Sequence, residues 1–368
     1  MSFFTSISGT SIFLPALIAL TVTLISTPLV IRFANHFGLV DDPRVRKHPA
    51  QLHRKTIPRA GGLAIYLGII ASALIFLPFS KQLWGILSGA TVLVFVGLAD
   101  DKFDLSPYLR LATNILAALL VVGSGVGISF ITNPFDGIVH LDTLRIQFEF
   151  FGPHSIIVWA DLFALVWIVW CMNMVNWSKG VDGQMPGFVG ISAIFLGLLF
   201  FRFLATDVSQ WTAASLAFIT AGAFLGFLPF NFYPQKIMPG YGGGSLAGFM
   251  LAVLAILSGG KVATAILVLG VPMMDAVYTI FRRILRGRSP VWGDRGHLHH
   301  KLIEFGWGKR RIALFYWLVS AILGTIALRL NSQQKFFTII LLGLAVGGLL
   351  LWLNFWATFS RLQDQDNG

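Results

Sequence analysis

Charged residues are scarce in this chain of 368 residues. Asp, Glu, Lys and Arg make up 12% of it, whereas about a quarter is usual for a soluble domain. Hydrophobic residues account for 56%, and the mean hydropathy is +0.77. One water-soluble core of this size cannot hide that much apolar surface. The composition therefore excludes an ordinary soluble domain and favours the bilayer as solvent.

Cysteine is nearly absent as well. The single Cys171 lies inside an apolar segment, which excludes an intrachain disulfide and a cysteine-based metal site. The first residues after Met1 carry no basic group, so we expect no cleaved signal peptide and take residues 11–34 as a permanent span.

Acidic residues are fewer than basic residues, and the net charge is +11. Such an excess suits nucleic acid, an acidic lipid surface or an anionic substrate. The basic residues lie in loops between apolar segments, so we expect no nucleic-acid partner. A polyphosphate substrate and the membrane topology explain the charge better.

Long apolar runs predict an all-α integral membrane protein with about 11 transmembrane helices. We expect one polytopic membrane domain over residues 1–361 and a frayed tail over 362–368. A glycine run opens the span at 243–258, which we expect to be the one most prone to start as a re-entrant turn. The expected spans are residues 11–34, 61–78, 83–99, 109–131, 155–175, 187–204, 211–228, 243–258, 262–281, 312–330 and 336–358.

The distribution of cations predicts the orientation. With the N-terminus outside and the C-terminus cytoplasmic, all but six of the 27 Lys and Arg residues lie inside, as the positive-inside rule requires. The long outer loop at 132–154 alternates apolar and polar residues and predicts a short β-hairpin on the outer face.

Two inner loops carry cations and carboxylates. The segment RKTIPRAGG contains Lys55 and Arg59; it is either an ordinary inner loop or a phosphate clamp. The segment GLADDKFDLSP contains the adjacent carboxylates of Asp100 and Asp101. Such a pair suits Mg²⁺ shared with substrate phosphates, or a base. Helix capping would explain one carboxylate but not both.

Amides and glycines mark two further loops. Asn173 and Asn176 share a helix face three residues apart, and Asp182 follows between two glycines. Asn231 lies in the motif FLPFNF, and the run GYGGGS comes shortly after it. Glycines before a helix suit either an anion site or close helix packing, and both interpretations stay open.

The last inner loop gathers histidines and arginines. Asp275 lies inside an apolar span, where an ionisable residue is functional by default. The histidines could bind zinc, but the surrounding arginines would repel a metal and attract phosphate, so a pyrophosphate loop is the better interpretation. The candidate residues of this loop are Arg282, Arg283, Asp294, Arg295, His297, His299 and His300.

With these motifs in place, the chain resembles the polyprenyl-phosphate N-acetylhexosamine-1-phosphate transferase superfamily, which is glycosyltransferase family 4, and its WecA/TagO branch more than its MraY branch. The likeness covers about residues 11–330. It is carried by GLVDDP, RKTIPRAGG, GLADDKFDLSP, NMVN with GVDG, FLPFNF and DRGHLHH.

The resemblance implies transfer of a sugar-1-phosphate from a nucleotide sugar, such as UDP-GlcNAc, to undecaprenyl phosphate. It also implies a multi-pass protein of the bacterial inner membrane with a cytoplasmic site, a role in cell-envelope glycan synthesis, a Mg²⁺ requirement and, by analogy, a homodimer. Asp100, Asp101 and Asp182 would be catalytic, and Asp100 and Asp101 metal-associated. The substrate-binding residues would be Lys55, Arg59, Asn173, Asn176, Asn231, Tyr241 and the histidine loop.

Two positions depart from the family pattern. Lys179 stands where an Asp is expected, and Tyr241 stands where the principal Mg²⁺ ligand is expected. Met238 also replaces an aromatic residue that stacks on uracil. We hypothesise that Lys179 supplies catalytic positive charge that Mg²⁺ supplies elsewhere, and that the Tyr241 hydroxyl donates to substrate. The alternative is a degenerate member that only binds polyprenyl phosphate or serves as a partner subunit.

Overall fold

The computed structural model describes residues 10–45, 55–149, 153–201, 210–259, 261–287, 289 and 296–366. Within them, helices account for most of the chain. The helices are α2 (Thr10–Phe37), α3 (Gly61–Phe76), α4 (Lys81–Phe103), α5 (Pro107–Val122), α6 (Val158–Trp177), α7 (Gln184–Phe200), α8 (Gln210–Asn231), α9 (Gly240–Leu257), α10 (Val262–Val268), α11 (Gly270–Leu285), α12 (Leu298–Glu304), α13 (Lys309–Arg329) and α14 (Ser332–Asp366).

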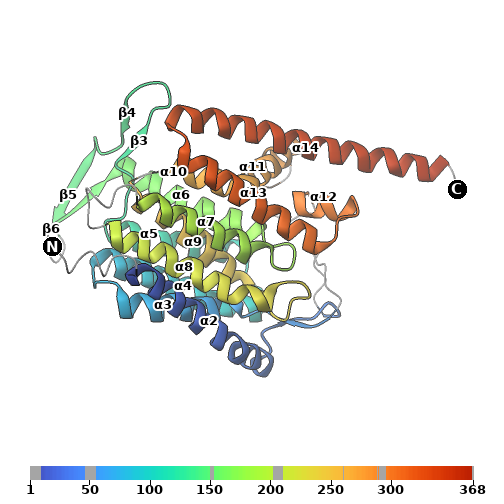
Figure 1. The fold of residues 1–368 in the computed structure, drawn as a ribbon, viewed down its shortest axis with the longest axis horizontal. Coiled ribbons are helices and arrows are strands. Elements are labelled where there is room, and N and C mark those ends of the chain that lie inside the picture. The colour runs from blue at the N-terminus through green and yellow to red at the C-terminus, as the bar shows by residue number, and fades with distance from the viewer. Residues whose placement is uncertain are drawn as a thin grey trace.

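The strands form three small antiparallel pairs in the described part of the chain. They are β1 (Val40–Asp41) with β2 (Ile57–Pro58), β3 (Phe130–Thr132) with β4 (Ile138–His140), and β5 (Arg145–Glu149) with β6 (Pro153–Ile157). The expected single hairpin near residues 132–154 is thus two hairpins. They lie at one end of the helix bundle, the hairpin end, while α12 lies at the other, the site end (Figure 1).

The helices fit a membrane protein. Among the described residues, seven helices are long and apolar enough to span a bilayer, and α10 with α11 would make an eighth. Helices α3, α5 and α7 are apolar but shorter. Every expected span overlaps one of these helices or the α10–α11 pair. The all-α, multi-pass class is confirmed, and the number of crossings stays a prediction.

The break in the helix pattern is not where the sequence indicated. Helix α9 runs unbroken, so the re-entrant start expected at 243–258 is wrong. Instead α10 and α11 meet at an angle of 90°. Pro272 explains the break, because its ring clashes with the carbonyl four residues earlier, at Val268, where α10 ends.

Helix α9 is the central helix and positions the site. Its residues from Gly240 to Ile256 are all buried, and α3, α4 and α6 pack around it. A Cβ added to Gly242 would lie 3.3 Å from the Cα of Gly97, and one added to Gly243 would lie 3.2 Å from the Cα of Gly62. The glycine run therefore serves close helix packing, one of the two interpretations left open.

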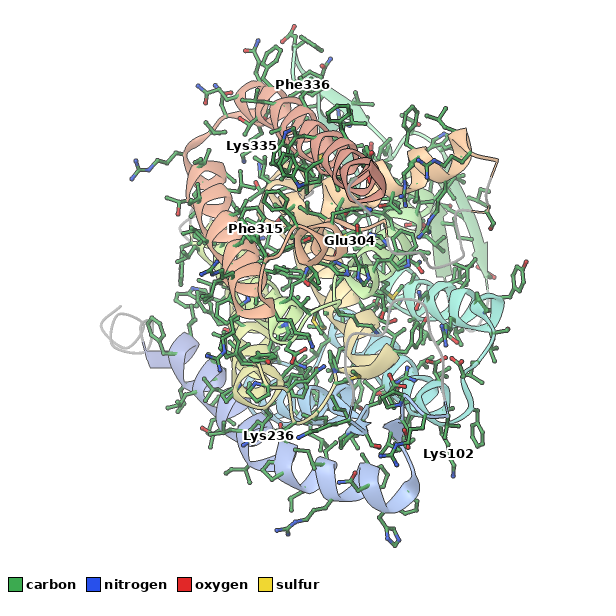
Figure 2. The ribbon with its side chains drawn as sticks, turned by 90° about the vertical axis from the view of Figure 1, so that its right-hand side faces the viewer. Lys102, Lys236, Glu304, Phe315, Lys335 and Phe336 are labelled. Carbon is green, nitrogen blue, oxygen red and sulfur yellow. The ribbon has the colours of Figure 1, made fainter. Side chains whose placement is uncertain are left out.

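Helix α14 closes the fold. It packs against α10, α11 and α12 and projects beyond the bundle at the site end (Figure 1). It continues to Asp366, so helix covers much of the segment expected to be a frayed tail. Figure 2 views the molecule from the site end and labels Lys102, Lys236 and Glu304, which come from α4, the loop after α8, and α12.

Candidate active site

Asp100 has a buried carboxylate in which one oxygen has no hydrogen-bond partner among the described residues. Its side chain has no exposed surface, and Oδ1 accepts a hydrogen bond from Nε of Arg110 at 2.6 Å. Oδ2 is buried and has no hydrogen-bond partner among the described residues. An unpartnered buried carboxylate oxygen is costly. It is therefore the group in the site most in need of a ligand.

Asp101, its neighbour, is engaged by the protein. Oδ1 lies 3.3 Å from Nε of Arg59 and accepts the backbone N–H of Tyr241 at 3.1 Å. A Cβ on Gly240 would collide with Oδ2, so the Gly240 backbone approaches the other oxygen closely. Asp101 thus caps the first turn of α9 and ties the Arg59 loop to it. The capping alternative applies to this carboxylate and not to Asp100.

Tyr241 points away from the carboxylates, toward α5. Its hydroxyl lies 2.9 Å from the backbone oxygen of Arg110 and 2.9 Å from Oδ1 of Asn114. The Arg110 guanidinium lies over its ring, 5.5 Å from the centroid. The ring positions Arg110, and its hydroxyl contacts protein groups.

Lys179 lies beside the carboxylate pair. Its ammonium donates to the carbonyl of Gly240 at 2.6 Å. Gly240 directly precedes Tyr241, whose N–H donates to Asp101. Burial lowers the pKa of Lys179 to about 7, and the charge of the nearby Asp101 carboxylate opposes that shift. Arg59 adds a further donor, since its Nη1 is buried without a hydrogen-bond partner in the described part of the chain.

Asp182 is paired with a lysine other than Lys179. Nζ of Lys309 lies 3.0 Å from Oδ1, and the backbone N–H of Gln235 donates to Oδ2 at 3.2 Å. Lys309 opens α13, 127 positions along the chain. Asp182 therefore joins the α6–α7 loop to α13 and to the loop after α8.

The three predicted amides are held by the protein. Asn173 donates to the carbonyl of Val169 in its own helix at 2.8 Å. Asn176 donates to the hydroxyl of Ser245 in α9 at 2.6 Å. Asn231 accepts from the N–H of Gly183 at 3.1 Å and donates within its own loop. These contacts fix the loops that carry Lys179 and Asp182.

The histidine loop is anchored by Asp275. Oδ1 of Asp275 accepts the N–H of Leu298 at 2.8 Å, and Oδ2 lies 3.0 Å from Nδ1 of His297. The buried carboxylate therefore holds the first turn of α12 and orients one imidazole. His299 stacks on His297 at 5.8 Å and lies 4.3 Å from His300 by ring centroids.

Gly180 joins the two halves of the site. A Cβ there would collide with the imidazole of His299, so the histidine loop touches the loop that carries Lys179. Burial and the two neighbouring imidazoles lower the pKa of His299 well below its usual value. His299 is therefore neutral near pH 7, and its Nδ1 has no hydrogen-bond partner among the residues described.

The remaining candidates surround these groups. Arg283 is buried, with its guanidinium 5.9 Å from the centre of the Trp177 ring, and the guanidinium of Arg282 lies against Gly296. Lys55 is exposed. Asp294 and Arg295 lie outside the described residues.

Sequence reasoning missed two cations. Arg110 was overlooked although it follows the carboxylate motif by one helical turn after the Ser106 cap and Pro107. The pairing of Lys309 with Asp182 has no local signal. The basic cluster that opens α13 was visible, but its partner was not.

The donor set does not fit a divalent metal. No group of three or more His, Cys, Asp or Glu that could hold one occurs within the described ranges. One oxygen of Asp101 and one oxygen of Asp100 are taken by protein groups. The cations around the carboxylate pair, Arg59, Arg110 and Lys179, favour a phosphate-bearing ligand.

A comparison of the whole chain with known proteins decides the family. The family model for glycosyl transferase family 4 matches residues 83–259. A probable undecaprenyl-phosphate N-acetylglucosaminyl 1-phosphate transferase of Bacillus subtilis is 31% identical over 326 residues, which are 86% of this chain and 84% of the relative. The chain belongs to glycosyl transferase family 4.

Other relatives agree. The decaprenyl-phosphate N-acetylglucosaminephosphotransferase of Mycobacterium leprae is 31% identical over 82% of this chain and 80% of its own. The undecaprenyl-phosphate alpha-N-acetylglucosaminyl 1-phosphate transferase of Escherichia coli K12 is 29% identical over 80% of this chain and 77% of its own. The expected superfamily is confirmed, and with it the enzyme class, a phosphoglycosyltransferase.

Proposed function

We propose that this family 4 enzyme transfers an N-acetylhexosamine-1-phosphate from a nucleotide diphosphate sugar, UDP-GlcNAc or a close analogue, to polyprenyl phosphate. The observation that carries the proposal is the buried Asp100–Asp101 pair, with Arg110 on Asp100, Arg59 on Asp101 and Lys179 beside both. Within it, Oδ2 of Asp100 has no partner in the described chain. The names of the relatives, which act on undecaprenyl or decaprenyl phosphate, support the lipid and the sugar.

The proposed reaction is a single phosphoryl transfer. An oxygen of the lipid phosphate forms a bond to the β-phosphorus of the donor, and the bond from that phosphorus to the bridging oxygen breaks. The nucleoside monophosphate leaves with the bridging oxygen. Asp100 orients the lipid phosphate or takes its proton. The cations hold the charge that develops on the phosphate oxygens.

The other residues take supporting roles in this proposal. The phosphates of the donor lie between Arg59 and the histidine loop, where Arg282, Arg283 and His297 complete the binding surface. Asn176 and Asp182 position the loop of Lys179 through Ser245 and Lys309. Since His299 is neutral, it contributes hydrogen bonds and not charge.

We also propose that the site end faces the cytoplasm of a bacterium, in its plasma membrane, and that the product starts a cell-envelope glycan. Cations gathered at the site end support that orientation. They include Lys102, Lys179, Lys236, Arg282, Arg283, Lys309 and Arg310.

A transfer assay tests the proposed function. Full-length protein is incubated in detergent with undecaprenyl phosphate and radiolabelled UDP-GlcNAc, UDP-GalNAc or another nucleotide sugar. We expect label in a lipid-soluble polyprenyl-pyrophosphate sugar and release of the nucleoside monophosphate. Lipid binding without transfer from any donor would instead indicate the degenerate binder.

A further inference from the structure

The carboxylates at this site already have cations of their own. Arg110 contacts Asp100 at 2.6 Å, and Arg59 contacts Asp101 at 3.3 Å. The ammonium of Lys179 acts electrostatically on both. Each buried carboxylate therefore has an arginine of its own with Lys179 nearby, and these positive charges oppose the binding of a divalent ion among them.

The backbone of Gly240 approaches Asp101 closely. Gly240 has a φ of +70°, a conformation that favours glycine, and a Cβ built on it would collide with Oδ2 of Asp101. Oδ1 of Asp101 accepts the Tyr241 N–H and lies 3.3 Å from Nε of Arg59. The protein therefore takes one oxygen of Asp101, as Arg110 takes one oxygen of Asp100.

Lys179 and Arg59 have N–H donors that no described protein group accepts. A lysine ammonium has three N–H groups, and the carbonyl of Gly240 takes one of those of Lys179. Nη1 of Arg59 is buried and, among the residues described, unpartnered. Both cations lie beside the carboxylate pair, and their remaining N–H groups suit an anionic ligand with several acceptor oxygens.

We infer that this site holds the diphosphate of its donor with protein cations, with Lys179 in the role of a divalent metal ion, and that it works without such an ion. The inference deepens the proposed function and rests on it for the identity of the donor. It concerns the diphosphate group itself, so it can be tested without turnover.

Calorimetry with inorganic pyrophosphate tests the inference. Full-length protein in detergent is titrated with pyrophosphate, once with EDTA and once with magnesium chloride. We expect the two Kd values to agree within about threefold. Binding seen only with magnesium would overturn the inference.

Variants test the role of Lys179. Lys179→Gln should weaken binding in EDTA at least tenfold, a loss of about 1.4 kcal/mol, whereas Lys102→Gln, a matched change on an exposed side chain of α4, should bind as the unchanged protein does. Lys179→Asp should bind only with magnesium. Equal binding by Lys179→Gln and the unchanged protein would overturn the assignment.

Two further measurements distinguish failure of the inference from misfolding and from failure of the proposed function. Lys179→Arg keeps the charge and should still bind in EDTA, which a general folding defect at this position would prevent. Pyrophosphate binding in EDTA without sugar transfer from any donor would support the inference and contradict the proposed function. Transfer that requires saturating magnesium would do the reverse.

Discussion

At the scale of single residues, two adjacent carboxylates have unequal surroundings. Oδ1 of Asp101 accepts the Tyr241 N–H and lies beside Arg59. Asp100 has Oδ1 on Arg110 and a buried Oδ2 with no partner among the described residues. Both are buried, so exposure does not distinguish them. Their hydrogen bonds do, and they assign capping to Asp101 and chemistry to Asp100.

Lys179 makes anion binding depend on pH. Since burial lowers the pKa of Lys179 to about 7, the ammonium is charged below that pH and neutral above it. Affinity for pyrophosphate in EDTA should fall about tenfold per pH unit above about pH 7. In Lys179→Arg the fall should be smaller, because arginine stays charged. Calorimetry from about pH 6 to about pH 9 checks this, and an affinity that rises with pH would contradict it.

At the scale of elements, α12 depends on a residue from α11. Asp275 is 1% exposed, caps the N–H of Leu298 and lies against Nδ1 of His297. A helix of seven residues has little stability of its own. Its position in the site therefore comes from this carboxylate.

Asp275→Asn should lower the free energy of unfolding by about 1–3 kcal/mol, because an amide replaces a buried charged acceptor. Thermal unfolding in detergent and faster hydrogen exchange over residues 297–304 measure the effect. The control is Glu304→Gln on the same helix, where a partly exposed pair with Lys301 at 2.9 Å is removed, with an expected cost below about 1 kcal/mol. Equal effects would refute the anchoring role.

Elements were easier to predict than contacts. Hydrophobic runs indicated every helical segment except α12, because burial in lipid depends on local composition. The break at Pro272 was not predicted. The glycine run instead suggested a break in α9, where packing against α3 and α4 keeps the helix intact. The pairs Asp182–Lys309 and Asp275–His297 join distant segments. Local motifs indicated the functional residues but not which side chains contact one another.

At the scale of the whole molecule, the two ends of the bundle differ. The site end carries α12 with its histidines, and the hairpin end carries β3 to β6 (Figure 1). The hairpins expose apolar side chains such as Ile138 and Ile146. A site at one end of a multi-pass bundle can serve a lipid phosphate and a water-soluble donor together.

Cysteine labelling in whole cells tests the orientation. The native Cys171 is buried and should stay unreactive, so a single introduced cysteine can be followed. A membrane-impermeant maleimide should label Asp142→Cys near the hairpins in intact cells, and Glu304→Cys at the site end after lysis. Labelling of Glu304→Cys from outside would reverse the proposed topology.

The most direct measurement of the central claim is sugar-phosphate transfer by Asp100→Asn. The exchange keeps the size of the side chain and removes the charge, so transfer should fall about a thousandfold while thermal unfolding shows a folded protein. Asp142→Asn, the same exchange on a 43% exposed side chain near the hairpins, should keep transfer within about fivefold. A folded Asp100→Asn enzyme with nearly full activity would contradict the account.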